Sequence, residues 1–282
     1  MLTWLGGGKK MRRLVIPFAL AVTSVIAVAA VTKHTDPELS QRWSDKQTEI
    51  AKLFDGYDGT FVLFDMNGEK YYRFNAREAT ERLSPCSTFK ILNSLIGLQT
   101  GVLSGKDHPI KWDGTKYDVE PWNKDQTLQS AIADSVVWYF QRVASEIGEK
   151  RMRQYIHAVG YGNRDISGGL TKFWLGSSLK ISANEQVQFL RRLVTNRLPF
   201  STKTTNTVKE LIFLKETNTG KLFGKTGSDR ENGKDTLGWF VGYVENRDGT
   251  YVFATNIRAN DGAYGRKARG ISEQILSLLG LF

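Results

Sequence analysis

A serine and a lysine stand three residues apart in the stretch SPCSTFK, residues 84–90. Ser84 is a typical N-cap and Pro85 a typical first helical residue, so a helix is predicted to begin here. Helical residues i and i+3 share a face, so Ser87 and Lys90 should meet. Free N–H groups of the first turn would favour an alkoxide. The competing interpretation is a core helix whose serine and lysine face solvent, because S-x-x-K alone is common.

A nucleophilic serine needs a base for its proton and donors for the developing oxyanion. The three histidines are isolated and no serine lies in a G-x-S-x-G elbow, so a Ser-His-Asp triad has no local support. The scattered histidines and one cysteine give no metal-ligand spacing. Lys90 could itself be the base, because full burial lowers a lysine pKa by about 3–5 units. Phe89, Ile91 and Leu92 are apolar enough to line such a pocket.

Further segments complete a set of motifs along the chain. They are Ser135-Val136-Val137, Tyr161-Gly162-Asn163, Trp174 and Lys225-Thr226-Gly227-Ser228. Each is a weak signal alone, but with Ser87-Thr88-Phe89-Lys90 and in this order they resemble the class D serine β-lactamases, the oxacillinase-type enzymes. The resemblance runs from about residue 36 to the C-terminus and implies a fold like that of penicillin-binding transpeptidases. The departures lie at 84–86 and 258–266 and concern substrate range more than reaction type.

The resemblance implies roles for the residues around the serine. Ser87 would form the acyl-enzyme, and Lys90 would react with CO2 to give a carbamate (N6-carboxylysine) that acts as general base. Trp174 would donate a hydrogen bond to this carbamate, and Val137 would supply an apolar wall. No cofactor is implied beyond this covalent CO2, and no metal.

The remaining motifs would face the substrate, a small β-lactam. Ser135 would relay a proton to the departing lactam nitrogen, beside the positive charge of Lys225. Thr226 and Gly227 would follow Lys225 on one strand and face the substrate. Ser228 comes next and would offer its backbone N–H. That group and the N–H of Ser87 would form the oxyanion hole.

An arginine of the last helix, together with Thr226, would hold the carboxylate of the substrate, because guanidinium is a two-pronged donor. We assign Arg269 to this role, with Arg266 as the alternative, since the register of the preceding loop is open.

The N-terminal segment is predicted to lie outside the folded domain. Four basic residues between positions 9 and 13 precede an uncharged apolar run, 14–31, with Ala27-Val28-Ala29 near its end. This pattern predicts a signal peptide over residues 1–30 and an exported catalytic domain, periplasmic or extracellular, over 31–282. The alternative is an uncleaved membrane anchor, because the run approaches the length that spans a bilayer.

Charge and cysteine content exclude other classes. The formal charge is +10, and residues 1–31 contribute four basic and no acidic side chains to it. The other basic residues alternate with acids, as in 146–153, which indicates a solvated surface and no nucleic-acid partner. Cys86 is the only cysteine, so no internal disulfide forms, and we expect it to be a buried packing group. Oligomeric state is left open.

Strand and helix patterns predict an α+β fold. Strands at 59–65 and 71–74 flank Asn67-Gly68, and strands at 236–245 and 250–258 flank a second turn, so two hairpins are expected. Helical spacing predicts helices at 36–54, 128–147, 149–159, 184–196 and 266–279. The order predicts one antiparallel sheet with N- and C-terminal helices and an inserted helical lobe, about 105–215.

Two other functions share this resemblance. One is a β-lactam-sensing receptor domain, which is acylated at S-x-x-K without turnover. Such sensors have a polar residue at the position of Val137 and a large membrane portion upstream. Here about 31 residues precede the domain. A cell-wall transpeptidase or carboxypeptidase also has a polar third residue in the second motif. Val137 and Trp174 therefore favour the enzyme.

Overall fold

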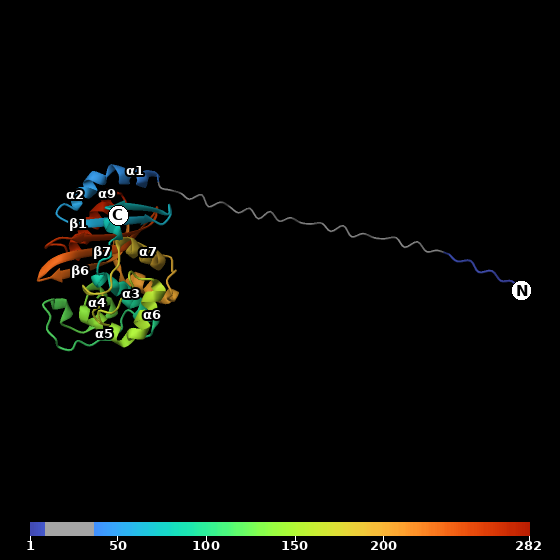
Figure 1. Ribbon diagram of the computed structural model, residues 1–282, viewed down its shortest axis with the longest axis horizontal. Helices are drawn as coiled ribbons and strands as arrows, with labels where there is room; N and C mark the ends of the chain where they lie inside the picture. The colour runs from blue at the N-terminus through green and yellow to red at the C-terminus, as the bar shows by residue number, and fades with distance from the viewer. Residues whose placement is uncertain (9–36) are drawn as a thin grey trace. The chain divides into compact units, whose positions relative to one another are not determined.

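The computed structural model describes residues 1–8 and 37–282 (Figure 1). Residues 1–8 form no helix or strand, and Lys33–Phe282 form one compact unit. Most of the predicted signal peptide, from residue 9 onward, lies outside the described residues. Within the two described ranges, no helix combines the length and apolarity needed to cross a bilayer.

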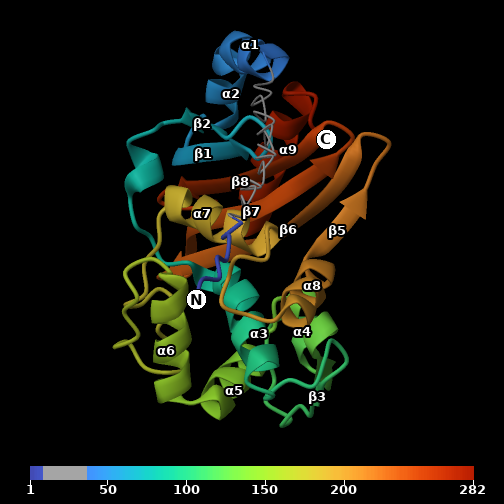
Figure 2. The same ribbon diagram turned by 90° about the vertical axis from the view of Figure 1, so that its right-hand side faces the viewer.

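The central element is a six-stranded antiparallel sheet, in the order β2-β1-β8-β7-β6-β5 (Figure 2). Its strands are β1 (Asp58–Asp65), β2 (Lys70–Phe74), β5 (Phe213–Glu216), β6 (Gly220–Glu231), β7 (Lys234–Asn246) and β8 (Gly249–Arg258). The predicted hairpins β1-β2 and β7-β8 are confirmed. The motifs did not predict β5, and β6 was anticipated only at its lysine-threonine-glycine segment. A separate short pair, β3 (Pro109–Ile110) and β4 (Gln126–Thr127), lies outside this sheet.

Both faces of the sheet are covered by helices. Side chains alternate along a strand, so Trp239 and Val241 of β7 enter one core while Phe240 enters the other. The Phe240 side is closed by α1 (Pro37–Asp45), α2 (Gln47–Leu53) and α9 (Gly265–Leu278). The Trp239 side is closed by α7 (Ala183–Val194) and α3 (Lys90–Gln99). The predicted fold class is confirmed.

The predicted helical lobe contains α4 (Leu128–Ala133), α5 (Val137–Ile147), α6 (Glu149–Val159), α7 and α8 (Thr202–Leu211), with the 3₁₀ turn η3 (Glu120–Trp122). Two further 3₁₀ turns, η1 (Glu78–Thr80) and η2 (Cys86–Phe89), precede it. The prediction of one helix over 128–147 is wrong, because Ser135 adopts φ 57° and separates α4 from α5. The helix predicted over 36–54 is likewise two helices, α1 and α2, divided at Lys46.

Strands β6 and β7 approach each other through glycine. A Cβ on Gly242 would lie 2.0 Å from the carbonyl oxygen of Phe223. The backbones of the two strands would have to move apart to make room for it. A Cβ on Gly270 in α9 would meet no atom within 4 Å.

We therefore expect Gly242→Ala to lower the free energy of unfolding by about 1–3 kcal/mol, the usual cost of overpacking. Gly270→Ala is the matched control and should raise it by up to about 1 kcal/mol, because alanine favours helix. Urea unfolding at one pH measures both. Equal effects of the two substitutions would contradict the close approach of the strands.

Candidate active site

Ser87 and Lys90 meet across a 3₁₀ turn rather than within an α-helix. Ser87 lies in η2, and Lys90 is the first residue of α3. Side chains at i and i+3 eclipse in a 3₁₀ turn, and here the Lys90 Nζ lies 2.6 Å from the Ser87 Oγ. The predicted N-cap role of Ser84 is wrong, because Pro85 occupies the cap and the Ser84 hydroxyl bonds elsewhere.

Ser135 joins two lysines from distant parts of the chain. Its Oγ lies 3.2 Å from the Nζ of Lys90 and 3.0 Å from the Nζ of Lys225. The left-handed conformation at Ser135 interrupts the helical stretch at this point, between Ala133 and Val137. Such a conformation costs on the order of 1 kcal/mol for a non-glycine residue and is kept where the surroundings fix it.

Burial makes the two lysines unlike each other. Lys90 is fully buried, with its Nζ 5.6 Å from the centre of the Phe140 ring. Desolvation, and next the nearby positive charge of Lys225, hold the pKa of Lys90 well below its ordinary value. Burial lowers the pKa of Lys225 to about 8. Burial and the neighbouring Lys225 therefore favour the neutral amine at Lys90, while Lys225, with a pKa of about 8, is mostly charged at neutral pH.

Phe140 is a residue that the motifs did not single out. Its ring covers the amine of Lys90, yet in the sequence it is one of several aromatic residues at the start of an apolar helix. Only its position five residues after Ser135 links it to a motif.

Trp174 brings a buried hydrogen-bond donor that is not used. Its side chain is fully buried and stacks on Phe89, with ring centres 5.4 Å apart. Its indole Nε1 has no hydrogen-bond partner among residues 1–8 and 37–282. A buried donor without a partner costs about 1–3 kcal/mol, so its retention indicates an acceptor that belongs to the site.

The Tyr161-Gly162-Asn163 motif shapes the loop that contains Trp174. The Asn163 amide donates to the carbonyl of Ser178, and its oxygen accepts the N–H of Lys180. Tyr161 is buried with its ring edge against Phe89, which also contacts Trp174. The motif therefore holds both ends of this loop together.

The segment from Lys225 to Ser228 lies on β6 beside the nucleophile. A Cβ on Gly227 would lie 2.9 Å from the carbonyl oxygen of Pro85, so glycine allows the strand to approach the serine turn. The Ser228 hydroxyl accepts the N–H of Gly265 at the start of α9. In the described sheet, β5 pairs with β6 only at 221–223, which leaves the edge from Thr226 onward without a second strand.

Val137 and the arginines of α9 occupy different surroundings. Val137 is half-buried at the first position of α5. The Arg269 guanidinium lies 2.6 Å from a Glu273 carboxylate oxygen and 5.7 Å from the centre of the Phe240 ring, in the core on the α9 side. Arg266 lines a hollow between α2 and α9. The structure does not bring either arginine into contact with the Ser87 cluster, so the carboxylate-binding assignment stays a prediction.

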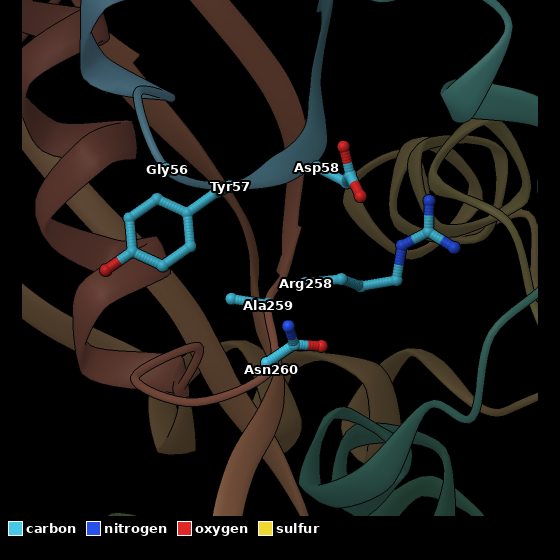
Figure 3. Close-up of a pocket in the computed structure, with 6 residues that line it drawn as sticks. All are labelled: Gly56, Tyr57, Asp58, Arg258, Ala259 and Asn260. Carbon is cyan, nitrogen blue, oxygen red and sulfur yellow. The ribbon is translucent and has the colours of Figure 1, made fainter.

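A separate surface hollow of about 550 Å³ lies at the ends of β1 and β8 (Figure 3). It is lined by Gly56, Tyr57, Asp58, Arg258, Ala259 and Asn260, none of them a residue of the motifs. Arg258 pairs with Glu78 and Glu81, so its charge is already neutralised. Among residues 1–8 and 37–282, no group of three or more metal-binding side chains is assembled.

The buried lysine predicts how stability depends on pH. In the unfolded chain, Lys90 keeps its proton up to a pH of about 10.4. In the native protein, the pKa of Lys90 is lower, so the amine loses its proton at a lower pH. Stability therefore rises with pH in this window, by up to about 1.4 kcal/mol per pH unit for one proton. In CO2-free buffer, Lys90→Met should be more stable than the wild type at pH 6 and should show a smaller slope.

Urea unfolding between pH 6 and 9 measures that slope. Lys150→Met, at an exposed position of α6, is the matched control. An unchanged slope in Lys90→Met would mean that Lys90 is protonated in the native state.

Comparisons with known proteins agree with this geometry. The family described as "Penicillin binding protein transpeptidase domain" matches residues 28–277. Probable beta-lactamase YbxI of Bacillus subtilis is 38% identical over 269 residues, which cover 94% of this chain and 97% of that protein. Regulatory protein BlaR1 of Bacillus licheniformis is also 38% identical, over 271 residues that cover 95% of this chain but only 45% of BlaR1.

Solved structures give the same result. The crystal structure of a class D beta-lactamase from Bacillus subtilis has a TM-score of 0.79 and 42% identity, covering 83% of this chain and 96% of that chain. Identity and coverage at these levels define the family, and in this chain contacts at hydrogen-bonding distance link Ser87, Lys90, Ser135 and Lys225 into one cluster. The chain belongs to the class D serine β-lactamases, a family of hydrolases built on the penicillin-binding transpeptidase fold.

Proposed function

We propose that the protein hydrolyses the β-lactam amide bond of penicillin-type antibiotics through an acyl-enzyme on Ser87. The observation that carries this proposal is the 2.6 Å contact between the Ser87 hydroxyl and a Lys90 amine that burial keeps neutral. A neutral amine or its derivative can accept the proton that the hydroxyl loses during attack. The sequence pattern of residues 1–30 supports export. The exported protein would hydrolyse the antibiotic in the cell envelope and so protect the cell from it.

We further propose that Lys90 is used as a carbamate. A neutral amine and CO2 form a carbamate with release of one proton, which requires the low pKa that burial produces. The fully buried anion would need donors, and the unused indole N–H of Trp174 and the Ser87 hydroxyl are suited to it. When bound, the carboxylate of the carbamate would supply an anionic general base beside Ser87.

The other residues have roles that their charge determines. Lys225, still protonated at neutral pH, raises the positive potential beside the Ser135 hydroxyl. Ser135 is therefore suited to pass a proton to the departing lactam nitrogen. The backbone N–H groups of Ser87 and Ser228 are the candidates for the oxyanion hole, and loss of one such donor typically costs about 2.7–4 kcal/mol of transition-state stabilisation.

A sensor is the second candidate function, because BlaR1 matches this chain as closely as YbxI does. Both functions require acylation of Ser87, so they differ only in whether the acyl-enzyme is then hydrolysed. The apolar Val137, half-buried two residues after Ser135, favours a lysine environment that remains poor in water. That environment favours the carbamate and therefore turnover.

Turnover distinguishes the two functions directly. We expect the purified protein to open a chromogenic β-lactam catalytically, faster with added bicarbonate and slower at acid pH, where protonation of the amine removes the carbamate. Steady-state absorbance measures the rate, and Ser87→Ala should abolish it. One burst of acylation equal to the protein concentration, without further turnover, would assign the chain to the sensors.

Labelled bicarbonate tests the carbamate itself. A ¹³C NMR signal in the carbamate region should be present in the wild type and absent in Lys90→Met. Trp174→Phe keeps the ring packing but removes the donor, so its signal should be weaker at the same bicarbonate concentration. Full turnover by a wild type that gives no carbamate signal would show that another base acts.

A further inference from the structure

We propose that Ser84 is a positioning residue for Trp174, and that it sets the affinity of Lys90 for CO2. The inference rests on the proposed carbamate and adds a residue that the motifs had assigned to a helix cap. Its basis is a set of hydrogen bonds that tie the Trp174 segment to the residues just before the nucleophile.

The Ser84 hydroxyl bonds to two backbone groups on either side of Leu175. It donates to the carbonyl of Trp174 and accepts the N–H of Gly176, each at 3.0 Å. Ser84 is buried, with 2% of its surface exposed, so water does not replace these bonds. One hydroxyl therefore fixes the backbone of the residue that carries the indole.

Ser84 is itself held in place from other directions. Its carbonyl accepts the indole N–H of Trp239, a core residue of β7, at 2.9 Å. The neighbouring Leu83 forms two backbone hydrogen bonds with Ile181, at 3.0 and 2.8 Å, at the far end of the same loop. Leu83 and Ser84 thus attach the Trp174 loop to the sheet and to the 3₁₀ turn η2 that carries Ser87.

The indole N–H is not oriented by a hydrogen bond to any group in the part of the chain that the structure describes. Trp174 Nε1 is buried there without a partner, and the ring packs against Phe89 and Phe173. Packing between flat rings tolerates sliding, whereas a hydrogen bond to a carbamate requires a donor within a few tenths of an ångström. The backbone anchor at Ser84 supplies the precision that stacking lacks.

Removal of the hydroxyl would leave the Trp174 carbonyl buried without its donor. The Gly176 N–H would then still have the Cys86 sulfur as an acceptor, which is weaker than a hydroxyl oxygen. A Cβ at Gly176 would lie 2.9 Å from a carboxylate oxygen of Asp229, so this side chain lies close to the loop at Gly176. The loop would shift locally while its ends stayed in place.

The experiment compares Ser84→Ala with Ser272→Ala in the full-length protein. Ser272 is also fully buried and also donates to a carbonyl, but it lies in the core on the α9 side. We expect Ser84→Ala to raise the bicarbonate concentration for half-maximal turnover at least about fivefold, because a charge-assisted hydrogen bond is weakened. At saturating bicarbonate its turnover should return to within about twofold of the wild type. Ser272→Ala should lower the melting temperature without changing the bicarbonate dependence.

Several results separate the possibilities. A folded Ser84→Ala with the bicarbonate dependence of the wild type would overturn the positioning role. A wild type without any bicarbonate dependence would overturn the carbamate and this inference together. If Ser84→Ala does not fold, Ser84→Cys, which keeps the size with a weaker donor, should show an intermediate shift, and no shift would count against the role. Rapid hydrogen exchange of the Gly176 amide in the wild type would also contradict it.

Discussion

The cost of burying a positive charge determines this site. Lys90 is buried beside Phe140 and stands near the positive charge of Lys225, so its surroundings favour the neutral amine over the charged one. The 3₁₀ turn then places this neutral amine against Ser87. Reactivity in this enzyme is thus a property of packing: the same pair on an exposed helix would have a charged lysine and an ordinary hydroxyl.

The sequence predicted the elements whose patterns are local and missed those that distant contacts impose. The hairpins around Asn67-Gly68 and 246–249 follow from turn residues and alternating strands, and the structure has both. The break at Ser135 has no local signal, because its conformation is fixed by Lys90 and Lys225 from other segments. The motifs brought together Ser87, Lys90, Ser135 and Lys225. The choice of Arg269 over Arg266 had no motif behind it, because the register of the preceding loop was open, and in the structure Arg269 pairs with Glu273.

The site is assembled from segments that meet through close backbone contact. Glycine at position 227 lets β6 touch the serine turn, and Ser84 holds the Trp174 loop on the turn's other side. The β6 segment at Gly227 and the Trp174 loop are therefore both held against residues 84–87. Movement of that turn would shift Ser87, Lys90 and these two segments together.

The position of Cys86 has a practical consequence. It is the only cysteine, it is 1% exposed, and burial, together with the charge of Asp229, raises the pKa of its thiol to about 12. Alkylation requires the thiolate, which attacks the reagent and displaces its leaving group, so this sulfur stays unreactive while the protein is folded. A cysteine introduced on the surface can therefore carry a fluorophore or spin label with the native sequence otherwise intact, and reaction at Cys86 becomes a gauge of unfolding.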